Sequence, residues 1–443
     1  MTDLNRRRQS NPWLILLLGA LAACGPFGTD IYLPGMPSIA ASFGVPAAAV
    51  AATLTAFIGG FSVGMMLHGP LSDAWGRRPV LLAGLVMFTG ASVACWLSHS
   101  ISQLMLMRFV QALGAGAASV LARTIARDAH EPDEASNILS MVALVTSIGP
   151  LLAPLIGGQL LLLGTWRMVF VALTLFGISC AVATYLWVPE TWPREKRASG
   201  TTAVVQAFIV YGRLLGNPVV WGHLLVGGMT FAAMFTYITE TPFVYIQYFH
   251  ISPQHYGLFF AFNVMGLMIG NILNARLVGR LGVLRMISAS STVSAVASLF
   301  VLFVCLTGWG GLWMIALGLC VVIGQVGVLT SNCMTDLMSR YPNNAGAAAA
   351  LFGAVQLAVG ALASFIVGQF SGASPAGIGY IIGVTGVIGY VGKMLIVRVH
   401  ARRSAAPMVP KHDEKQDGLN DLNSFKPRKY RCVELPQGAY NRP

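Results

Sequence analysis

Long apolar stretches recur along the whole chain and constrain its fold more than any other feature. Twelve of them are long enough to cross the hydrocarbon core of a bilayer, for which an α-helix needs about 20 residues. These stretches cover residues 12–33, 47–68, 79–98, 102–126, 135–163, 166–188, 218–243, 255–276, 285–307, 311–335, 345–370 and 376–399. The chain is only 10% charged, whereas about a quarter of the residues of a soluble domain are charged. The sequence therefore predicts an all-α integral membrane protein.

A long polar connection divides the predicted spans into two sets of six. The divisions are a cytoplasmic N-terminus (1–11), an N-terminal six-helix bundle (12–188), a cytoplasmic linker (189–217), a C-terminal six-helix bundle (218–400) and a disordered cytoplasmic tail (401–443). A faint internal repeat supports this division. The segment Ala275–Arg285 follows the eighth span as Gly69–Arg78 follows the second, and Gly282 corresponds to Gly76.

Basic residues are distributed unequally between the two sides of the predicted bundle. Arg167 is the only lysine or arginine on one side, while the other side contains all the remaining basic residues of the connections. Because basic loops stay in the cytoplasm, both termini are predicted to be cytoplasmic. The net charge of +12 is thus explained by topology, and no nucleic-acid partner is expected.

Other chemistry has little support in the sequence. The seven cysteines match no zinc, redox or disulfide pattern, and six of them lie in apolar runs. The sequence contains no metal-ligand cluster, no phosphate-binding glycine loop and no nucleophile with an oriented base. We expect no cofactor, no metal and no enzymatic activity, and we expect a monomer in the lipid bilayer.

The connection between the second and third spans has an unusual sequence, GPLSDAWGRR, at Gly69–Arg78. Gly69 and Gly76 would let the backbone turn tightly, and Pro79 suits the first position of the following helix. A charged turn bracketed by glycines is thus predicted between two membrane spans.

The charged residues of this turn suggest a gate. Asp73 can accept hydrogen bonds from a helix N-terminus of the opposite half, while Arg77 and Arg78 can pair with a carboxylate such as Asp128. Such contacts would close the cytoplasmic side and give an outward-open state. The alternative is that the arginines only determine topology.

These residues stand where the signature of the major facilitator superfamily has them, between its second and third helices. Further stretches resemble the same family: TDIYLPGMP at Thr29–Pro37, RFVQALGAGAAS at Arg108–Ser119 and AGAAAALFGAVQ at Ala345–Gln356. The segment Gly149–Gly158 resembles the fifth-span signature of antiporters, in which Gly149, Pro154, Gly157 and Gly158 match and Ala153 replaces a usual glycine.

Together these stretches resemble the Bcr/CflA group, twelve-span drug:proton antiporters of bacterial inner membranes. The resemblance implies two six-helix bundles around a central cavity, and proton-driven efflux of a small drug-like molecule by alternating access. A major facilitator transporter of one specific metabolite is the alternative function.

Ionisable side chains inside the spans are few. An uncompensated charge at the centre of a membrane costs at least about 2.5–3.5 kcal/mol, so each needs a partner or a function. Asp30 and Arg108 are predicted at depths that differ by about 5 Å, in the outer part of the N-terminal half. We hypothesise that Asp30 exchanges protons and that Arg108 biases its charge state. A fixed structural pair, or an interfacial Asp30 that caps a broken helix, is the alternative.

Glu240 is predicted at the same level in the other half. It could attract cationic substrates or bind a second proton, and a solvated carboxylate at a helix end is the alternative. Asp336 is expected to pair with Arg340, four residues further along the same helix face, in a structural role.

Aromatic, thioether and amide side chains on inward faces are candidates for substrate binding. The candidates are Tyr32, Phe57, Phe61, Met65, Phe231, Phe235, Tyr237, Phe262 and Gln356. Ordinary helix packing is the alternative for the stripe formed by Phe57, Phe61 and Met65.

Overall fold

Twelve helical segments long and apolar enough to span a membrane make up the computed structural model, which describes residues 12–193, 209–370 and 374–405. The N-terminal set contains α2 (Pro12–Asp30) with η1 (Leu33–Gly35) and α3 (Met36–Phe43), α4 (Ala47–Trp75), α5 (Arg77–Trp96), α6 (Ile101–Asp128), α7 (Pro132–Leu160) and α8 (Arg167–Trp187). The C-terminal set contains α10 (Pro218–Pro242) with η3 (Phe243–Tyr248), α11 (Pro253–Leu281), α12 (Val283–Thr307), α13 (Gly311–Arg340) with η4 (Pro342–Asn344), α14 (Ala345–Gly368) and α15 (Ala376–Ala405). No strand occurs in these ranges, which confirms the predicted fold class.

Several helices extend beyond the predicted spans. The helix α4 continues to Trp75, α11 to Leu281 and α13 to Arg340, because polar residues outside the hydrocarbon can still complete helical turns. The predicted linker is also partly ordered, since residues 209–215 are helical and Leu214 is buried. The predicted disordered tail lies outside the described residues from 406 onward, and so do residues 1–11.

Glycines let neighbouring helices approach closely in both sets. A methyl group added at Gly64 or Gly116 would collide with the backbone where α4 crosses α6. In the second set, one added at Gly266 or Gly270 would collide with the backbone of α13 where α11 crosses it. Small residues are what close helix contact in lipid requires, because apolar lipid gives helices no hydrophobic reason to associate. Close glycine contacts therefore occur where α4 crosses α6 and at the equivalent crossing of α11 with α13, which supports the predicted repeat of six helices.

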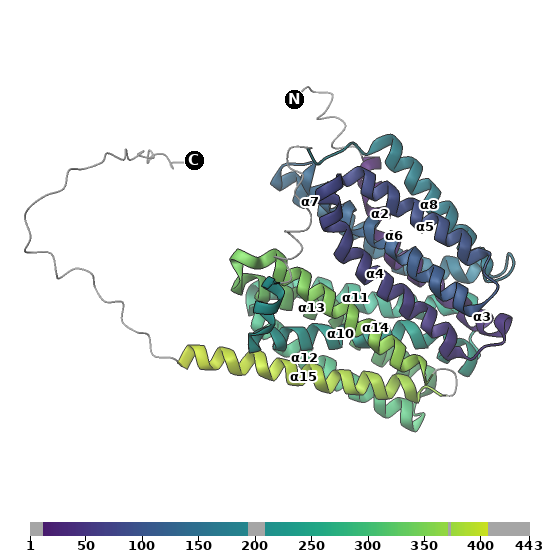
Figure 1. Cartoon of the computed structure of the whole chain (residues 1–443). Helices are drawn as coiled ribbons and strands as arrows, with labels where there is room; N and C mark the ends of the chain where they lie inside the picture. The colour runs from purple at the N-terminus through teal and green to yellow at the C-terminus, as the bar shows by residue number, and fades with distance from the viewer. Residues whose placement is uncertain (1–11, 194–208, 371–373, 406–443) are drawn as a thin grey trace, which may run out of the picture. The chain divides into compact units, whose positions relative to one another are not determined.

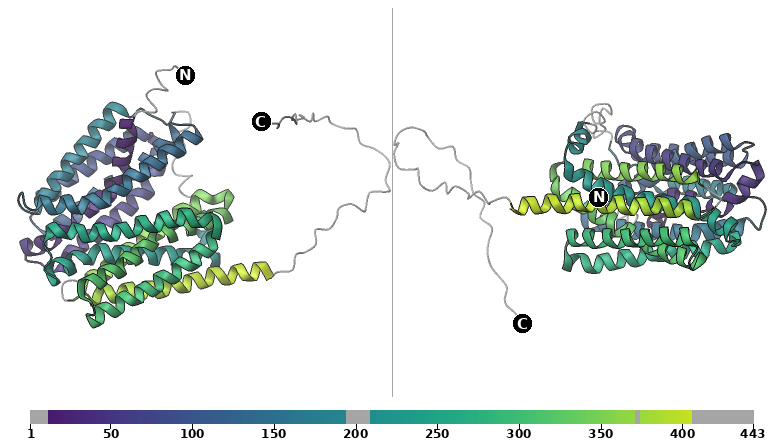
Figure 2. Two further views of the ribbon diagram at one scale, coloured as in Figure 1. Left: turned by 180° about the vertical axis from the view of Figure 1, so that it is seen from behind. Right: turned by 90° about the horizontal axis from the view of Figure 1, so that it is seen from below.

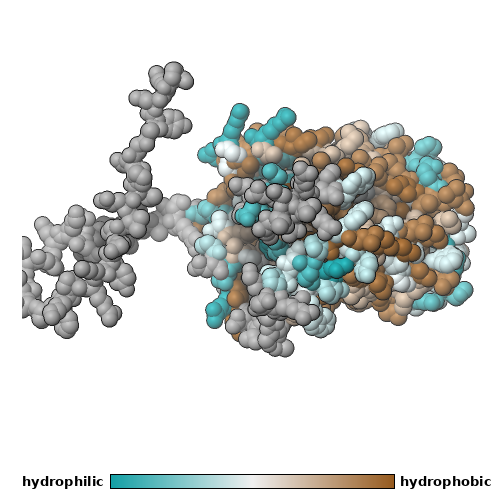
Figure 3. Space-filling model, turned by 90° about the horizontal axis from the view of Figure 1, so that it is seen from above, coloured by the Kyte–Doolittle hydropathy of each residue, from teal (hydrophilic) through white to brown (hydrophobic). Residues whose placement is uncertain are grey.

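The surface matches a lipid environment. Large apolar side chains such as Val86, Leu163 and Trp313 are well exposed, and Figure 3 shows apolar residues over much of one face. Hydrophilic residues occur at both ends of that face. This distribution is expected when the middle of the helices contacts hydrocarbon and their ends contact water.

The start of α2 and the end of α15 lie at one end of the helices, which we term the terminal end (Figure 1). The two sets of helices meet at the opposite end, which we term the distal end. At the distal end α4 packs on α14 and α7 packs on α11. The hydroxyl groups of Thr55 and Ser364 lie 3.0 Å apart across the first contact, and Ser364 also bonds Thr239 at 2.7 Å.

Candidate functional site

Arg108 is fully buried on α6 inside the N-terminal set. Its Nη1 donates hydrogen bonds to the Gly28 carbonyl oxygen at 3.0 Å and to Gln111 Oε1 at 2.7 Å. Its guanidinium carbon lies 4.1 Å from the centre of the Phe57 ring and 4.5 Å from that of Tyr32. Aromatic faces stabilise a desolvated cation by roughly 2 kcal/mol or more. Arg108 is thus a buried cation held by rings and neutral acceptors.

Asp30, the last residue of α2, is also buried. The structure does not show it in an ion pair with Arg108, although Arg108 binds the carbonyl of Gly28 two residues earlier. The Asp30 carboxyl lies instead within electrostatic range of the Tyr237 and Tyr256 hydroxyls of the C-terminal set. Depth along a helix follows from its rise, but the direction of a side chain around the axis depends on packing, which explains the difference from the expected pairing.

Tyr237 and Tyr256 belong to a buried polar cluster that the sequence analysis missed, apart from Tyr237. The Tyr256 hydroxyl lies 3.0 Å from Thr241 Oγ1, and the Asn263 side chain lies beside Tyr237 and Tyr245. These residues come from α10, η3 and α11. The available signal was a set of tyrosines and an asparagine within otherwise apolar helices, where a polar group needs a partner.

Glu240 lies on α10 within the same distal region and is fully buried. The alternative of a solvated carboxylate at a helix end is therefore excluded in this conformation. Its neighbour Thr239 bonds Ser364, which connects this part of α10 to the contact between the two sets.

The antiporter-like segment of α7 forms part of the distal contact. A methyl group at Gly157 would collide with the carbonyl of Ile31, the residue after Asp30. At Gly158 it would lie 2.6 Å from the carbonyl oxygen of Pro253 on α11. At Gly149 it would meet only Ala23, at an ordinary 3.6 Å. Pro150 and Pro154 lie inside the helix, where each lacks the amide hydrogen of a helical bond.

The segment Gly69–Arg78 is mostly helical, which corrects the predicted tight turn. Gly69 lies within α4, and only Gly76 has a left-handed backbone, with φ of 101°. Because α5 already begins at Arg77, Pro79 is the third residue of that helix and not its first. Gly282 between α11 and α12 has φ of 82°, so the predicted repeat of this turn is present.

Arg77 is buried and binds residues of its own half. It forms ion pairs with Asp73 and with Asp128, the latter at 3.0 Å. Its backbone N–H donates a hydrogen bond to Glu190 Oε1, with a nitrogen–oxygen distance of 3.0 Å. The guanidinium also lies 4.6 Å from the ring centre of Trp192. Glu190 and Trp192 were not among the predicted gating residues. Their position immediately after the sixth span, next to the conspicuous turn, was the available signal.

Arg78 contacts a different neighbour in the same half. Its Nη2 donates to the Tyr185 carbonyl oxygen at 2.7 Å, and its guanidinium lies 5.3 Å from the Tyr185 ring centre. Within the described ranges, the hydrogen bonds and ion pairs of the Arg78 and Asp73 side chains are to their own half.

The predicted substrate-binding side chains are placed in different surroundings. Gln356 bonds Thr330 Oγ1 at 3.1 Å, Tyr237 stacks on Phe260 at 5.3 Å, and Phe262 is exposed on the outside of α11. Buried members are Tyr32, Phe57, Phe235, Tyr237 and Gln356, and partly exposed members are Phe61, Met65 and Phe231. Phe61 packs beside Gly25 of α2. The structure therefore does not bring these nine side chains together at one place.

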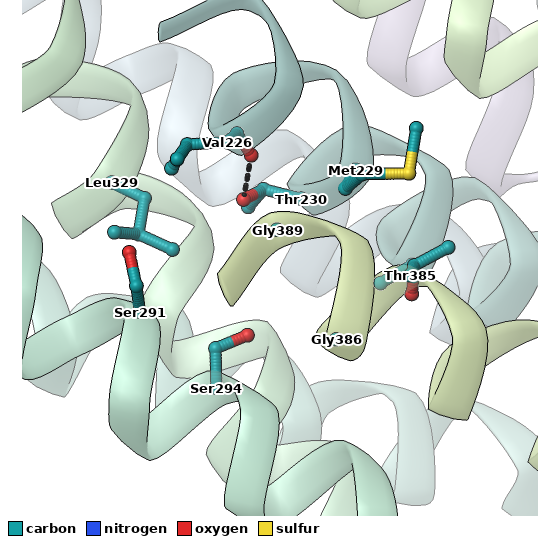
Figure 4. A pocket seen from close by; sticks show the side chains of 10 residues that line it. Val226, Met229, Thr230, Ser291, Ser294, Leu329, Thr385, Gly386 and Gly389 are labelled. Atoms are coloured by element: carbon teal, nitrogen blue, oxygen red, sulfur yellow. Dashed lines mark hydrogen bonds between the residues drawn. The ribbon is translucent and has the colours of Figure 1, made fainter. Parts of the chain in front are cut away.

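A small pocket lies inside the C-terminal set (Figure 4). It is lined by the hydroxyl-bearing residues Thr230, Ser291, Ser294 and Thr385, and its volume of about 10 Å³ is near the minimum for one water molecule. It is separate from the predicted substrate residues, and its size excludes a drug-like molecule in this conformation.

The sequence profile of the Major Facilitator Superfamily matches residues 18–364. A bicyclomycin resistance protein homolog of Haemophilus influenzae is 31% identical over 356 residues, which cover 80% of this chain and 88% of that protein. Multidrug resistance protein D of Escherichia coli is 32% identical over 231 residues, 52% of this chain and 57% of that protein.

Among solved structures, the crystal structure of a D-xylose-proton symporter has a TM-score of 0.69 at 18% identity, covering 87% of this chain and 97% of that one. This similarity concerns the fold. Together with the family match, it confirms the prediction of a transporter and not an enzyme. The chain belongs to the major facilitator superfamily, and within it is similar to the bicyclomycin and multidrug resistance proteins of the Bcr/CflA type.

Proposed function

We propose that the protein exports small drug-like molecules across the bacterial inner membrane in exchange for protons. Its similarity to a bicyclomycin resistance protein homolog and to multidrug resistance protein D supports drug export, and the antiporter-like segment of α7 supports exchange. The observation that carries the proposal is Asp30, a carboxyl buried where the N-terminal set meets the C-terminal set.

In this proposal, closure of the distal contact depends on the protonation of Asp30. Enclosing an ionised carboxylate without a cation costs several kcal/mol, so the distal ends close over the neutral acid. Opening the distal end would admit water to Asp30 and allow it to ionise. Protonation from the distal side would then favour the closed arrangement described above, and release toward the other side would allow it to reopen.

Arg108 is a positioning residue in this scheme. Its bond to the Gly28 carbonyl fixes the last turn of α2, which carries Asp30. Its Nε and Nη2 have no hydrogen-bond partner among the described residues. These donors are available to stabilise the Asp30 carboxylate once the distal contact opens, because an arginine guanidinium binds carboxylates well.

The terminal end faces the cytoplasm in this proposal, as the distribution of basic residues supports. The present arrangement, with its distal ends in contact, is then the inward-facing half of an alternating-access cycle. Asp73 would leave Arg77 and bind the opposite half only when the cytoplasmic side closes. Phe61, Met65 and Phe231 are the candidate aromatic and thioether contacts for substrate that retain some accessibility.

Efflux from a bacterium that lacks its own pumps tests the proposal. Cells that express the protein should accumulate less of several drugs, and an uncoupler should abolish the difference. The variant Asp30→Asn should lose uncoupler-sensitive export, while Glu240→Gln, if Glu240 selects cations, should lose cationic drugs only.

Two results would contradict the proposal. Export that persists after the proton gradient collapses would exclude antiport, as would wild-type export by Asp30→Asn. Protection against no compound of a broad panel would favour a transporter of one specific metabolite.

A further inference from the structure

A buried histidine faces a carboxylate near the terminal end of the C-terminal set, far from Asp30. His223 on α10 is fully buried, and its Nε2 lies 2.6 Å from Asp336 Oδ2 on α13. Its other ring nitrogen, Nδ1, lies 2.8 Å from the Val219 carbonyl oxygen. The imidazole therefore bridges two oxygen atoms.

The hydrogen atoms of this bridge can be counted. A carbonyl oxygen only accepts hydrogen bonds, so Nδ1 must carry a hydrogen atom. An ionised carboxylate also only accepts, so Nε2 must carry one as well. Arg340 donates to both oxygens of Asp336, from Nε to Oδ2 at 2.8 Å and from Nη2 to Oδ1 at 3.3 Å, which stabilises the carboxylate as an anion.

We propose that His223 and Asp336 form a proton-binding site in which His223 is held as the imidazolium. The hydrogen bond from Nε2 to Asp336 joins α10 to α13. Release of the proton would leave the ring one hydrogen atom for two acceptors, so the bond to Asp336 or the bond to the Val219 carbonyl would be lost.

The charged surroundings fit this assignment. Arg340 Nη2 lies 2.8 Å from both ring nitrogens of His400 on α15. Cys333 lies one turn before Asp336 on α13, and Lys393 of α15 bonds Thr292 on α12. The helix α14 contains no charged residue or histidine.

The site is independent of the proton exchange proposed for Asp30. The next acidic residue on α10 is Glu240, about 25 Å further along the helix at 1.5 Å per residue. His223 and Asp30 thus lie toward opposite ends of the helices. A proton at His223 would bind whether or not export depends on Asp30.

Nitrogen-15 NMR of the full-length protein, labelled in its eight histidines, tests the assignment at pH 8. Both ring nitrogens of one histidine should show imidazolium shifts, whereas a free histidine is almost entirely neutral at this pH. His223→Asn should remove that signal, and Asp336→Asn should convert it to a neutral ring. Thermal unfolding would verify that each variant is folded.

His68 supplies the matched control, because its Nδ1 lies 2.7 Å from the carbonyl of Gly64, also four residues earlier, with no carboxylate among its described contacts. His68→Asn should leave the imidazolium signal unchanged. A wild-type spectrum in which every histidine is neutral at pH 8 would overturn the proposal. An imidazolium signal that survives in His223→Asn would overturn it too. If Asp336→Asn does not fold, the spectra of His223→Asn and His68→Asn decide whether the imidazolium signal belongs to His223.

Discussion

Two buried ionisable residues, Asp30 and Arg108, have different surroundings. Arg108 is surrounded by aromatic faces and neutral acceptors, whereas Asp30 is buried within electrostatic range of the Tyr237 hydroxyl of the opposite half. A fixed ion pair would hold both charges permanently. Their separation instead leaves Asp30 able to change its charge without losing a partner that holds the N-terminal set together.

Replacement of Arg108 by lysine should destabilise the protein although the charge is kept. Lysine cannot present a planar group to Phe57 and Tyr32 or donate in the same geometry to Gly28 and Gln111. We expect a loss of roughly 2 kcal/mol, measured by thermal unfolding in detergent. Export should fall as well.

Arg167 provides the control for this substitution. Its guanidinium stacks on Trp166 at 4.4 Å and donates to the carbonyl oxygens of Trp96 and Ser98, but it is only partly buried. Arg167→Lys should therefore change stability by less than Arg108→Lys. Equal losses of stability in the two variants would show that burial does not increase the contribution of Arg108 to stability.

At the scale of elements, α7 and the turn between α4 and α5 mark the two ends of the bundle. The segment of α7 from Gly149 to Gly158 brings its backbone against η1 and α11 at the distal end. The turn after α4 forms an ion-paired cluster around Arg77 at the terminal end. The helix α7 therefore allows close backbone contact at the distal end, and the turn between α4 and α5 has ion pairs at the terminal end that could change partners.

Gly158→Ala should weaken the distal contact, because the added methyl group would lie 2.6 Å from the Pro253 carbonyl oxygen. Gly149→Ala is the matched control on the same helix, with its nearest contact at 3.6 Å. A cysteine introduced at Gln254 should react faster with an impermeant maleimide in the Gly158→Ala background alone. Equal labelling rates in both backgrounds would contradict the role assigned to Gly158.

Asp73→Asn should affect export more than stability. The Asp73 side chain is 47% exposed, so water screens its ion pair with Arg77, and ion pairs with an exposed partner contribute about 0–1 kcal/mol. Asp128 is 14% exposed, so Asp128→Asn should lower the unfolding temperature further. Unchanged export in Asp73→Asn would remove the gating role.

For the whole molecule, the important property is that the two sets of helices meet at the distal end through small and hydroxyl-bearing residues. Ala51 approaches Gly368, and Thr55 bonds Ser364. Such a contact can open at little cost. This is what an alternating-access transporter requires of the surface between its halves.

A disulfide across this contact should stop transport. A β-carbon built at Gly368 lies 2.9 Å from that of Ala51, so small backbone shifts would give the spacing of a disulfide in Ala51→Cys with Gly368→Cys. Oxidation should abolish export and reduction should restore it. The two single-cysteine variants are controls, and full export by the oxidised double variant would show that the distal ends need not separate.

Sequence alone determined the twelve spans and the family, because hydrophobic length and short signatures are local properties of the chain. It also indicated the repeated glycine turn at Gly76 and Gly282. Only the tertiary structure decided that Asp30 is buried without an ion pair to Arg108 and that His223 meets Asp336. A helix sequence fixes how deep a residue lies, but the direction of its side chain depends on packing between segments far apart in the chain.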